Sequence, residues 1–314
     1  MDATVLCFGN LQLDVLCRTV LTLPPPGELH MIDAIDFALS GNGGNVAAAL
    51  SRLGVEVELA GYTGADMIGE HSRTTLADLG VVTDKLLRHP TASTGTSVIT
   101  LSPGGERSII FVNGANALFD LDTVPDAWLD NKRVVSVSSV FVLPQFTGEA
   151  VGRLFARARA YGATTVLNIC WDFEGWGLPF LESALAEADY FILSYDEGRQ
   201  LSGHTVPESI LDSLQKYTQG TVVLTLGADG CCLRYGNALQ RIPALPVEAT
   251  DCTGAGDSFV AGFITGLVND RSVYECAHLG CKVAAFAVTG PGSYLRIPRL
   301  AEVEQRDIQS TLTN

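Results

Sequence analysis

Short apolar runs alternate with longer helical patterns through the second half of the chain, from residue 133 onward. Runs of four or five apolar residues between turns are typical of buried strands, and the segments between them have helical periodicity. Such alternation predicts a doubly wound, mainly parallel sheet flanked by helices, with right-handed crossovers. The predicted strands are 134–137, 164–167, 190–193 and 221–225, and the predicted helices are 148–161, 178–186 and 207–217.

Four further strands in the first third of the chain alternate apolar with polar residues. They are predicted at 11–16, 31–39, 96–101 and 107–111. Alternation indicates a sheet with one solvated face. Because these strands interleave with elements of the main sheet, we expect one α/β domain over residues 1–314. A small β-sheet lid would be inserted into it at about 11–39 and 95–112.

Composition narrows the class of protein. The chain has 314 residues, with 20 basic and 35 acidic side chains and a formal net charge of −15, which argues against binding to nucleic acid or to an anionic membrane. The eight cysteines form no C-x-x-C pair, so we expect buried, reduced thiols. The N-terminus lacks a basic leader and no apolar run reaches the length of a membrane span, so we expect a cytoplasmic protein.

One stretch near the C-terminus indicates chemistry on an anion. Residues 251–257 read Asp-Cys-Thr-Gly-Ala-Gly-Asp and lead into an apolar helix. The amides of a first helical turn lack intrahelical acceptors and lie at the positive end of the dipole, which suits a phosphate. An N-capped helix after a glycine turn is the structural alternative, but it leaves the carboxylate of Asp257 in that anion site unexplained. A proton-accepting role toward a group that attacks phosphate explains it.

Three other loops fall at predicted strand ends, where ligands of open α/β sheets collect. Asp14, beyond Gly9-Asn10, would reach the site from the lid, although it also suits a surface strand. The glycine-rich loop with Gly41 and Asn45 suits a polyol, or a tight turn with Asn45 as the N-cap of a helix over 45–53. The loop with Thr225, Gly227 and Gly230 suits nucleotide phosphate, or a plain turn between strands. Each of these loops is a weak signal by itself.

Together these residues resemble the ribokinase-like (PfkB) carbohydrate kinases. The family's C-terminal signature D-T-x-G-A-G-D is matched by 251–257, with Thr253 displaced one place by Cys252. The N-terminal glycine-rich signature is similar at 41–54, and the T-x-G-x-x-G turn at 225–230. The resemblance extends from about residue 4 to 300, in the family's order and spacing.

The resemblance implies a sheet lid over a doubly wound α/β domain and ATP-dependent phosphorylation of a sugar-like hydroxyl. Asp257 would be the general base, and Gly254, Ala255 and Gly256 the anion hole. The sugar would lie against Asp14, Gly41 and Asn45, and the nucleotide against Thr225, Gly227 and Gly230.

The resemblance also implies cations, and here the chain departs from the family. The family motif N-x-x-E, which helps to position Mg²⁺ and phosphate, reads Ser194-Tyr195-Asp196-Glu197. Glu197 would act on Mg²⁺ indirectly, and Ser194 would lie at the nucleotide. A monovalent cation such as K⁺ would draw on Asp251, Thr253 and carbonyls near 288 and 292. Arg296, where ribokinases tend to have serine, argues against K⁺ activation.

Several functions are compatible with these residues. The first is a kinase acting on a hydroxymethyl group of a sugar or sugar acid of the ribose, fructose or 2-keto-3-deoxygluconate type. The alternative is a nucleoside kinase, whose lid needs aromatic side chains toward the base; Phe37, Phe111, Trp171 and Trp176 are candidates. A catalytically silent sugar or nucleotide sensor is a third. The absence of G-x-x-x-x-G-K-[ST] excludes a P-loop kinase, and no dinucleotide fingerprint supports a dehydrogenase.

The predicted lid also bears on assembly. Its strands leave one apolar face that a thin sheet cannot bury alone, so we expect a homodimer through the lid sheets.

Overall fold

The computed structural model describes residues 4–102, 104, 106–235 and 238–305. Its strands are β1 (Val5–Phe8), β2 (Gln12–Arg18), β3 (Ala34–Ser40), β4 (Val57–Gly64), β5 (Leu86–His89), β6 (Gly95–Leu101), β7 (Arg107–Val112), β8 (Val134–Ser138), β9 (Thr164–Asn168), β10 (Tyr190–Ser194), β11 (Thr221–Thr225), β12 (Cys231–Tyr235) and β13 (Ala238–Ile242). Its α-helices are α1 (Asn42–Leu53), α2 (Met67–Asp78), α3 (Gly148–Ala160), α4 (Gly177–Glu187), α5 (Tyr195–Ser202), α6 (Pro207–Leu214), α7 (Ala255–Val268), α8 (Val273–Ala287) and α9 (Leu300–Gln305). Within these ranges, no helix is both long enough and apolar enough to cross a bilayer.

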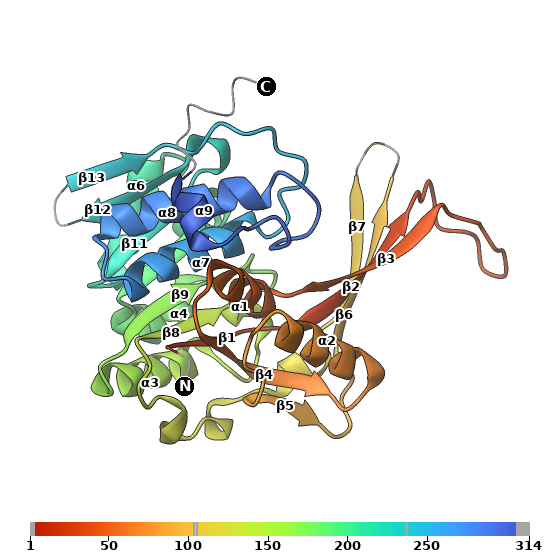
Figure 1. Ribbon diagram of the computed structural model, residues 1–314, viewed down its shortest axis with the longest axis horizontal. Helices are drawn as coiled ribbons and strands as arrows, with labels where there is room; N and C mark the ends of the chain where they lie inside the picture. The colour runs from red at the N-terminus through yellow and green to blue at the C-terminus, as the bar shows by residue number, and fades with distance from the viewer. Residues whose placement is uncertain (1–3, 103, 105, 236–237, 306–314) are drawn as a thin grey trace.

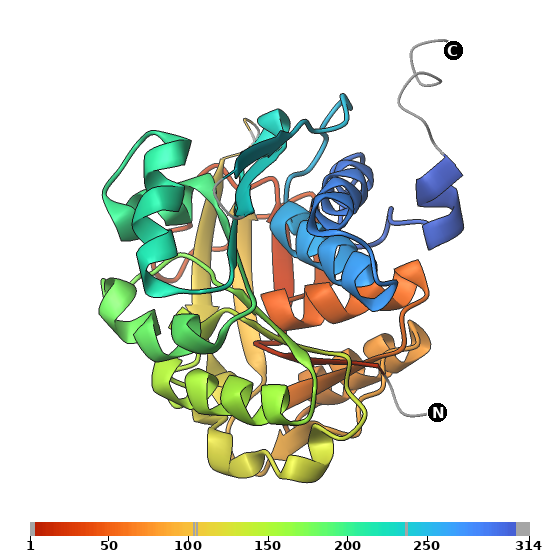
Figure 2. The ribbon, with the colours of Figure 1, turned by 90° about the vertical axis from the view of Figure 1, so that its left-hand side faces the viewer.

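The main sheet has nine strands in the order β13-β12-β11-β10-β9-β8-β1-β4-β5. The seven strands from β11 to β5 pair in parallel, while β12 pairs antiparallel with β11 and β13 pairs antiparallel with β12. The predicted doubly wound, mainly parallel α/β fold is therefore confirmed. Figure 2 shows helices on both sides of this sheet, with α3 to α6 in green on one side and α1, α7 and α8 in orange and blue on the other.

Both faces of the main sheet are buried, and alternate residues of each strand enter different cores. In β1, Val5 and Cys7 belong to the core that contains α1, α7 and α8. Leu6 and Phe8 belong to the core that contains α3, α4 and α6. Strands covered on both faces by crossover helices have apolar residues at every position, and this explains the continuous apolar runs in the sequence.

A second sheet, the lid, has four strands in the order β3-β2-β6-β7. Its two central strands, β2 and β6, pair in parallel, and the outer strands pair antiparallel to them. Figure 1 shows these four strands projecting away from the helices and the main sheet. The predicted small separate sheet is confirmed.

The structure corrects two predicted boundaries. Helix α1 begins at Asn42, so the predicted start at Asn45 is wrong. Gly43 and Gly44 lie inside the first turn, where a Cβ on Gly43 would approach the Cα of Gly9 to 2.7 Å. Close packing thus overrides the turn preference of glycine. Strand β3 begins at Ala34 rather than at residue 31, because β2 ends at the partner of Ala34, Arg18.

The cysteines follow the expectation of free thiols, with three differences in burial. All eight are free. Five are buried, as expected, whereas Cys17 and Cys170 are half-buried and Cys252 is exposed. Cys252 lies in the loop before α7, where the chain passes over the surface.

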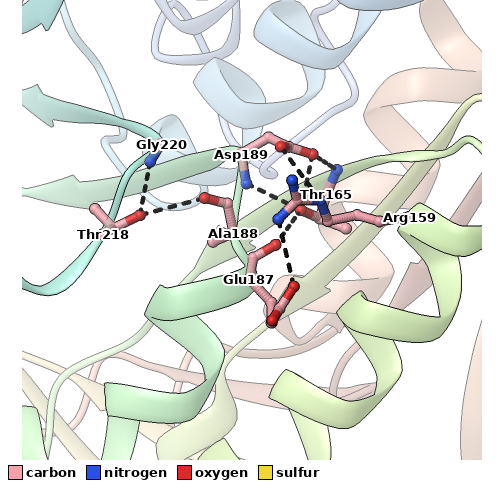
Figure 3. Close-up of polar contacts among 7 residues, drawn as sticks. All are labelled: Arg159, Thr165, Glu187, Ala188, Asp189, Thr218 and Gly220. Carbon is pink, nitrogen blue, oxygen red and sulfur yellow. Dashed lines mark hydrogen bonds and ion pairs between the residues drawn. The ribbon is translucent and has the colours of Figure 1, made fainter.

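A polar cluster joins the N-terminal ends of β9, β10 and β11 (Figure 3). The Thr165 amide and hydroxyl both donate to Asp189 Oδ2, at 2.9 and 3.0 Å, and the Asp189 amide donates to the Thr165 hydroxyl at 2.9 Å. Thr218 donates to the carbonyl of Ala188 at 3.3 Å and accepts from the Gly220 amide at 2.9 Å. The cluster satisfies backbone groups at the sheet edge opposite the carboxyl ends of these strands.

We expect Asp189→Ala to destabilise the protein by about 1–3 kcal/mol, because the buried Thr165 amide loses its acceptor, whereas the Thr165 hydroxyl keeps the Glu187 carbonyl at 2.8 Å. A lower melting temperature by circular dichroism would show this loss. Asp78→Ala, at the exposed end of α2, is the control for an aspartate change outside the cluster. An unchanged melting temperature for Asp189→Ala contradicts the proposed stabilising role.

Candidate active site

Three adjacent parallel strands end in polar residues that line one cavity. Asn168, Ser194 and Thr225 are the last residues of β9, β10 and β11. The cavity measures about 240 Å³ and is also lined by Glu197 and by residues 254–257. Carboxyl ends of parallel strands meet at one edge, which is where open α/β sheets place ligands. The structure therefore brings the 225–230 loop and the 251–257 stretch together, as the sequence predicts.

The start of α7 has the geometry of an anion site. Gly254 has φ 72°, and a Cβ there would lie 2.1 Å from the Cβ of Ser293, so only glycine fits. The Ala255 amide donates to the Cys252 carbonyl at 3.2 Å, and the amide of Ser258 donates to the Gly254 carbonyl at 2.9 Å. The amides of Gly256 and Asp257 lie between these two bonds in the first turn. They present partial positive charge at the end of a fourteen-residue helix.

The side chain of Asp257 is buried beside this turn and accepts from two asparagines. Asn42 Nδ2 lies 2.8 Å from Oδ1, and Asn45 Nδ2 lies 2.8 Å from Oδ2. Burial raises the pKa of Asp257 to about 6, although the hydrogen bonds from Asn45 and Asn42 act to lower it. A carboxylate with a pKa near neutrality suits a group that accepts and releases a proton.

The start of α1 holds the two asparagines in place. Gly41 has φ 91°, and a Cβ there would lie 2.6 Å from the Asn10 carbonyl oxygen, so this position also requires glycine. The Asn42 amide donates to Asn10 Oδ1 at 3.0 Å. Asn45, expected as a possible N-cap, lies in the first turn and points its amide at Asp257.

A chain of hydrogen bonds connects the lid to Asn10 and so to the start of α1. Asn10 Nδ2 donates to Gln12 Oε1 at 3.1 Å, and Gln12 Nε2 donates to Asp14 Oδ1 at 2.9 Å and to Ser97 Oγ at 2.8 Å. Asp14 is buried and lines a cavity of about 610 Å³ between the lid and the body, together with Ser40. This cavity is large enough for a sugar-sized molecule.

A third cavity continues from the polar one. It measures about 290 Å³ and contains the predicted Thr225, Gly227 and Gly230. Thr225, Cys252, Ala255 and Gly256 line both cavities. The rest of the wall is mostly apolar: Ala228, Ala244, Leu245, Pro246, Val247, Ala249, Phe259, Cys281, Ala284, Ala285 and Val288.

Ser194 and Glu197 have a structural role as well as a place in the site. The Ser194 hydroxyl accepts from the Glu197 amide at 3.3 Å, and Glu197 Oε2 accepts from the Ser194 amide at 2.7 Å, which is a capping box on α5. Burial raises the pKa of Glu197, against these hydrogen bonds with Ser194. In the part of the chain that the structure describes, no three His, Cys, Asp or Glu side chains gather as a metal site.

Asp251 and Thr253 form a tight turn before α7. The Thr253 amide and hydroxyl donate to Asp251 Oδ1 at 2.9 and 2.7 Å. Arg107, the first residue of β7, also donates to both residues from the lid. Burial by itself would raise the pKa of Asp251, but the hydrogen bonds from Thr253 and Arg107 hold the pKa below its usual value.

The sequence reasoning missed four polar residues of the site: Gln12, Asn42, Asn168 and Arg107. Gln12 lies two residues before Asp14 in the same strand and so on the same face of the lid, and Asn42 lies within the glycine-rich loop. Both positions could therefore have been predicted from their spacing to residues already named. Asn168 ends a predicted strand beside Ser194 and Thr225, which is also a sequence signal. The contact of Arg107 with Asp251 could not be found from spacing, because the two residues lie 144 positions apart in the sequence.

Comparison with known proteins identifies the family. The model of the pfkB family of carbohydrate kinases matches residues 2–300. The chain belongs to the PfkB family. It is therefore a phosphotransferase that acts on alcohol groups.

The matches to individual relatives cover nearly the whole chain. A ribokinase from Staphylococcus aureus (strain COL) is 28% identical, with 97% of this chain and all of the relative covered. A nucleoside kinase from Methanothermobacter thermautotrophicus is 26% identical, with 97% and 96% covered. The solved structure of Arabidopsis thaliana ribokinase complexed with ribose and ATP superimposes with a TM-score of 0.85 at 23% identity, over 97% of this chain and 98% of that one. Because the two relatives differ so little in identity, identity does not select the substrate.

We expect Asn45→Leu to raise the pKa of Asp257 above 6, because one of its two stabilising donors is lost. The aspartate carboxyl ¹³C shifts, followed against pH, measure this pKa, and Asp257→Asn identifies its signal. A control variant, Asn269→Leu at the end of α7, should leave the pKa unchanged. A pKa that stays the same or falls in Asn45→Leu contradicts the assignment of the donor.

Proposed function

We propose that this protein transfers the γ-phosphate of ATP to a hydroxymethyl group of a sugar or sugar acid. The observation that carries the proposal is the position of Asp257. Its carboxylate is buried at the first turn of α7, beside the polar cavity, and is joined through Asn42, Asn10 and Gln12 to Asp14 in the lid. A hydroxyl bound under the lid would then meet a proton acceptor and a phosphate site together.

The cavities fit ATP and Mg²⁺. The apolar cavity beside Gly227 and Gly230 suits the base, and the start of α7 suits the phosphates. Asn168 Oδ1 is buried without a hydrogen-bond partner, and Glu197 lines the same polar cavity. Hard oxygen atoms such as these are the partners of hydrated Mg²⁺. Mg²⁺ bound with ATP neutralises phosphate charge.

The residues of this chain then have the following roles. Asp14 accepts from hydroxyl groups of the acceptor substrate, since its carboxylate lines the cavity under the lid. Asp257 Oδ accepts the proton of the attacking hydroxyl, while Asn42 and Asn45 hold the carboxylate in position. The amides of Gly256 and Asp257 stabilise negative charge on the transferred group without reorganising.

Asp257→Asn should lower kcat by roughly two or more orders of magnitude, because the amide cannot accept the proton. In the wild-type protein, kcat/KM should fall as the pH drops through about 6, since Asp257 is then protonated. A coupled assay of ADP release measures both. The control Asp212→Asn, on the exposed side of α6, should behave as wild type. Near-normal turnover of Asp257→Asn would contradict the assignment of Asp257 as the proton acceptor.

One observation favours a nucleoside as the acceptor. Phe111 pairs with Ser97, which pairs with Asp14, so Phe111 lies on the cavity face of the lid and could cover a base. Phe37 pairs with Val15 and lies on the opposite face. Trp171 lines a separate pocket, and Trp176 packs against Phe180 with ring centroids 4.6 Å apart and the rings tilted by 31°.

A thermal-shift screen distinguishes sugars from nucleosides. Ribose, fructose and 2-keto-3-deoxygluconate should raise the melting temperature more than adenosine or inosine does. Phe111→Ala serves as the matched variant, because it should weaken stabilisation by a nucleoside and leave that by a sugar intact. A larger shift with adenosine, lost in Phe111→Ala, makes the protein a nucleoside kinase.

We also propose a homodimer formed by the outer faces of two lids. On that face, Phe37, Val15, Val98 and Ile110 form one apolar row across all four strands. The side chains of the outer strands are largely exposed: Phe37 by 65% and Ile110 by 63%. Apolar rows of this kind on a thin sheet are typical of surfaces that a partner covers.

Phe37→Asp should convert the dimer to a monomer, because it would place a charge at one end of the apolar row that the dimer would bury. Light scattering at micromolar protein concentration measures the mass. Val206→Asp, at an exposed position before α6, is the control and should remain dimeric. A monomeric mass for the wild-type protein contradicts the proposal.

A further inference from the structure

Arg107 connects the tip of the lid to the turn that begins the anion site. Its Nη1 lies 2.8 Å from Thr253 Oγ1, and its Nη2 lies 3.1 Å from Asp251 Oδ1. The partners are 146 and 144 residues away in the sequence, on the body of the protein. Thr253 directly precedes Gly254, the N-cap of α7. The position of the lid is therefore coupled, through this contact, to the geometry of the first turn of α7, which contains Asp257.

The same turn was expected to hold a monovalent cation, and its residues do not fit one. Asp251 Oδ1 already accepts from the Thr253 amide, the Thr253 hydroxyl and Arg107. The Val288 carbonyl accepts from the amides of Thr250 and Asp251, at 2.7 and 3.2 Å. Proton donors thus point at the oxygens that a cation would need. The guanidinium adds a positive charge at the turn, which repels a second one.

A second guanidinium lies near this turn. A Cβ on Gly290 would lie 2.4 Å from Arg296 Nε, so the side chain of Arg296 packs against the backbone of the 288–292 segment. The segment that was expected to supply carbonyl ligands is therefore bordered by arginine. Arg107 and Arg296 have the same electrostatic effect, because each guanidinium places a permanent positive charge where a free cation was expected.

We propose that the Arg107 guanidinium replaces a monovalent cation at the 251–253 turn, so that turnover is independent of K⁺ and depends on contact between lid and body. This inference rests on the proposed kinase function. Arg107 acts as a positioning residue: it holds Asp251 and Thr253, and through them the first turn of α7. A guanidinium remains charged at any pH at which the protein is folded and binds two oxygens at once, which suits a permanent replacement.

The first experiment compares chloride salts of K⁺, Na⁺ and choline at equal ionic strength. For the wild-type protein, kcat should agree within twofold in all three salts. The melting temperature of the ligand-free protein should also be the same in K⁺ and choline. Saturable activation by K⁺ of fivefold or more, or a K⁺-specific rise in melting temperature, overturns the proposal. The melting temperature needs no acceptor substrate, so a failure of the kinase assignment is distinguishable from a failure of this inference.

The second experiment removes the guanidinium and supplies a cation from solution. Arg107→Met, assayed in choline chloride, should lose tenfold or more in kcat, and added guanidinium or K⁺ should recover part of the loss. Arg88→Met is the matched control, since Arg88 is similarly exposed and pairs with Glu70 in the body. Its kcat should equal that of wild type. Wild-type kcat in Arg107→Met overturns the proposal, as does a loss that neither cation recovers, which assigns Arg107 a purely structural role.

Discussion

The buried carboxylate of Asp257 is the interaction on which the rest of the site depends. Removing a carboxylate from water is unfavourable unless hydrogen-bond donors meet it, and here Asn42 and Asn45 supply them. Both donors project from the first turn of α1, which Gly41 and Asn10 hold in place. Two helices from opposite ends of the sequence must therefore meet at their starts, and their packing sets the pKa of Asp257 near neutrality.

The main sheet and the lid contribute different parts of the site around Asp257. The main sheet brings Asn168, Ser194 and Thr225 to one edge, while the polar cluster around Thr165 and Asp189 stabilises the opposite edge. The lid contributes Asp14 to the cavity between the lid and the body, and Arg107 of the lid binds Asp251 in the body. The cavity under the lid is lined by Asp251 and Thr253, and the polar cavity by residues 254–257, so both border the segment that begins α7.

Much of this could be predicted from sequence, because local patterns report local structure. Apolar runs predicted the strands from β8 to β11, and alternation predicted the lid. The glycine-rich loops predicted where the chain approaches itself closely, as at Gly254 and Gly41. The start of α1 was predicted wrongly, because glycine in a first turn is unfavourable by propensity and is compensated only by contact with Gly9.

The sequence by itself determined the alternation of strands and helices from residue 133 onward, the glycine turn before α7 and the presence of the Asp257 carboxylate in the first turn of that helix. Each of these depends on neighbours within a few residues, through periodicity, capping and turn geometry. Only the tertiary structure decided which donors Asp257 receives, that Gln12 connects Asp14 to them, and that Arg107 binds the turn at Asp251. These contacts join segments far apart in the chain, and their partners are selected by packing rather than by local pattern.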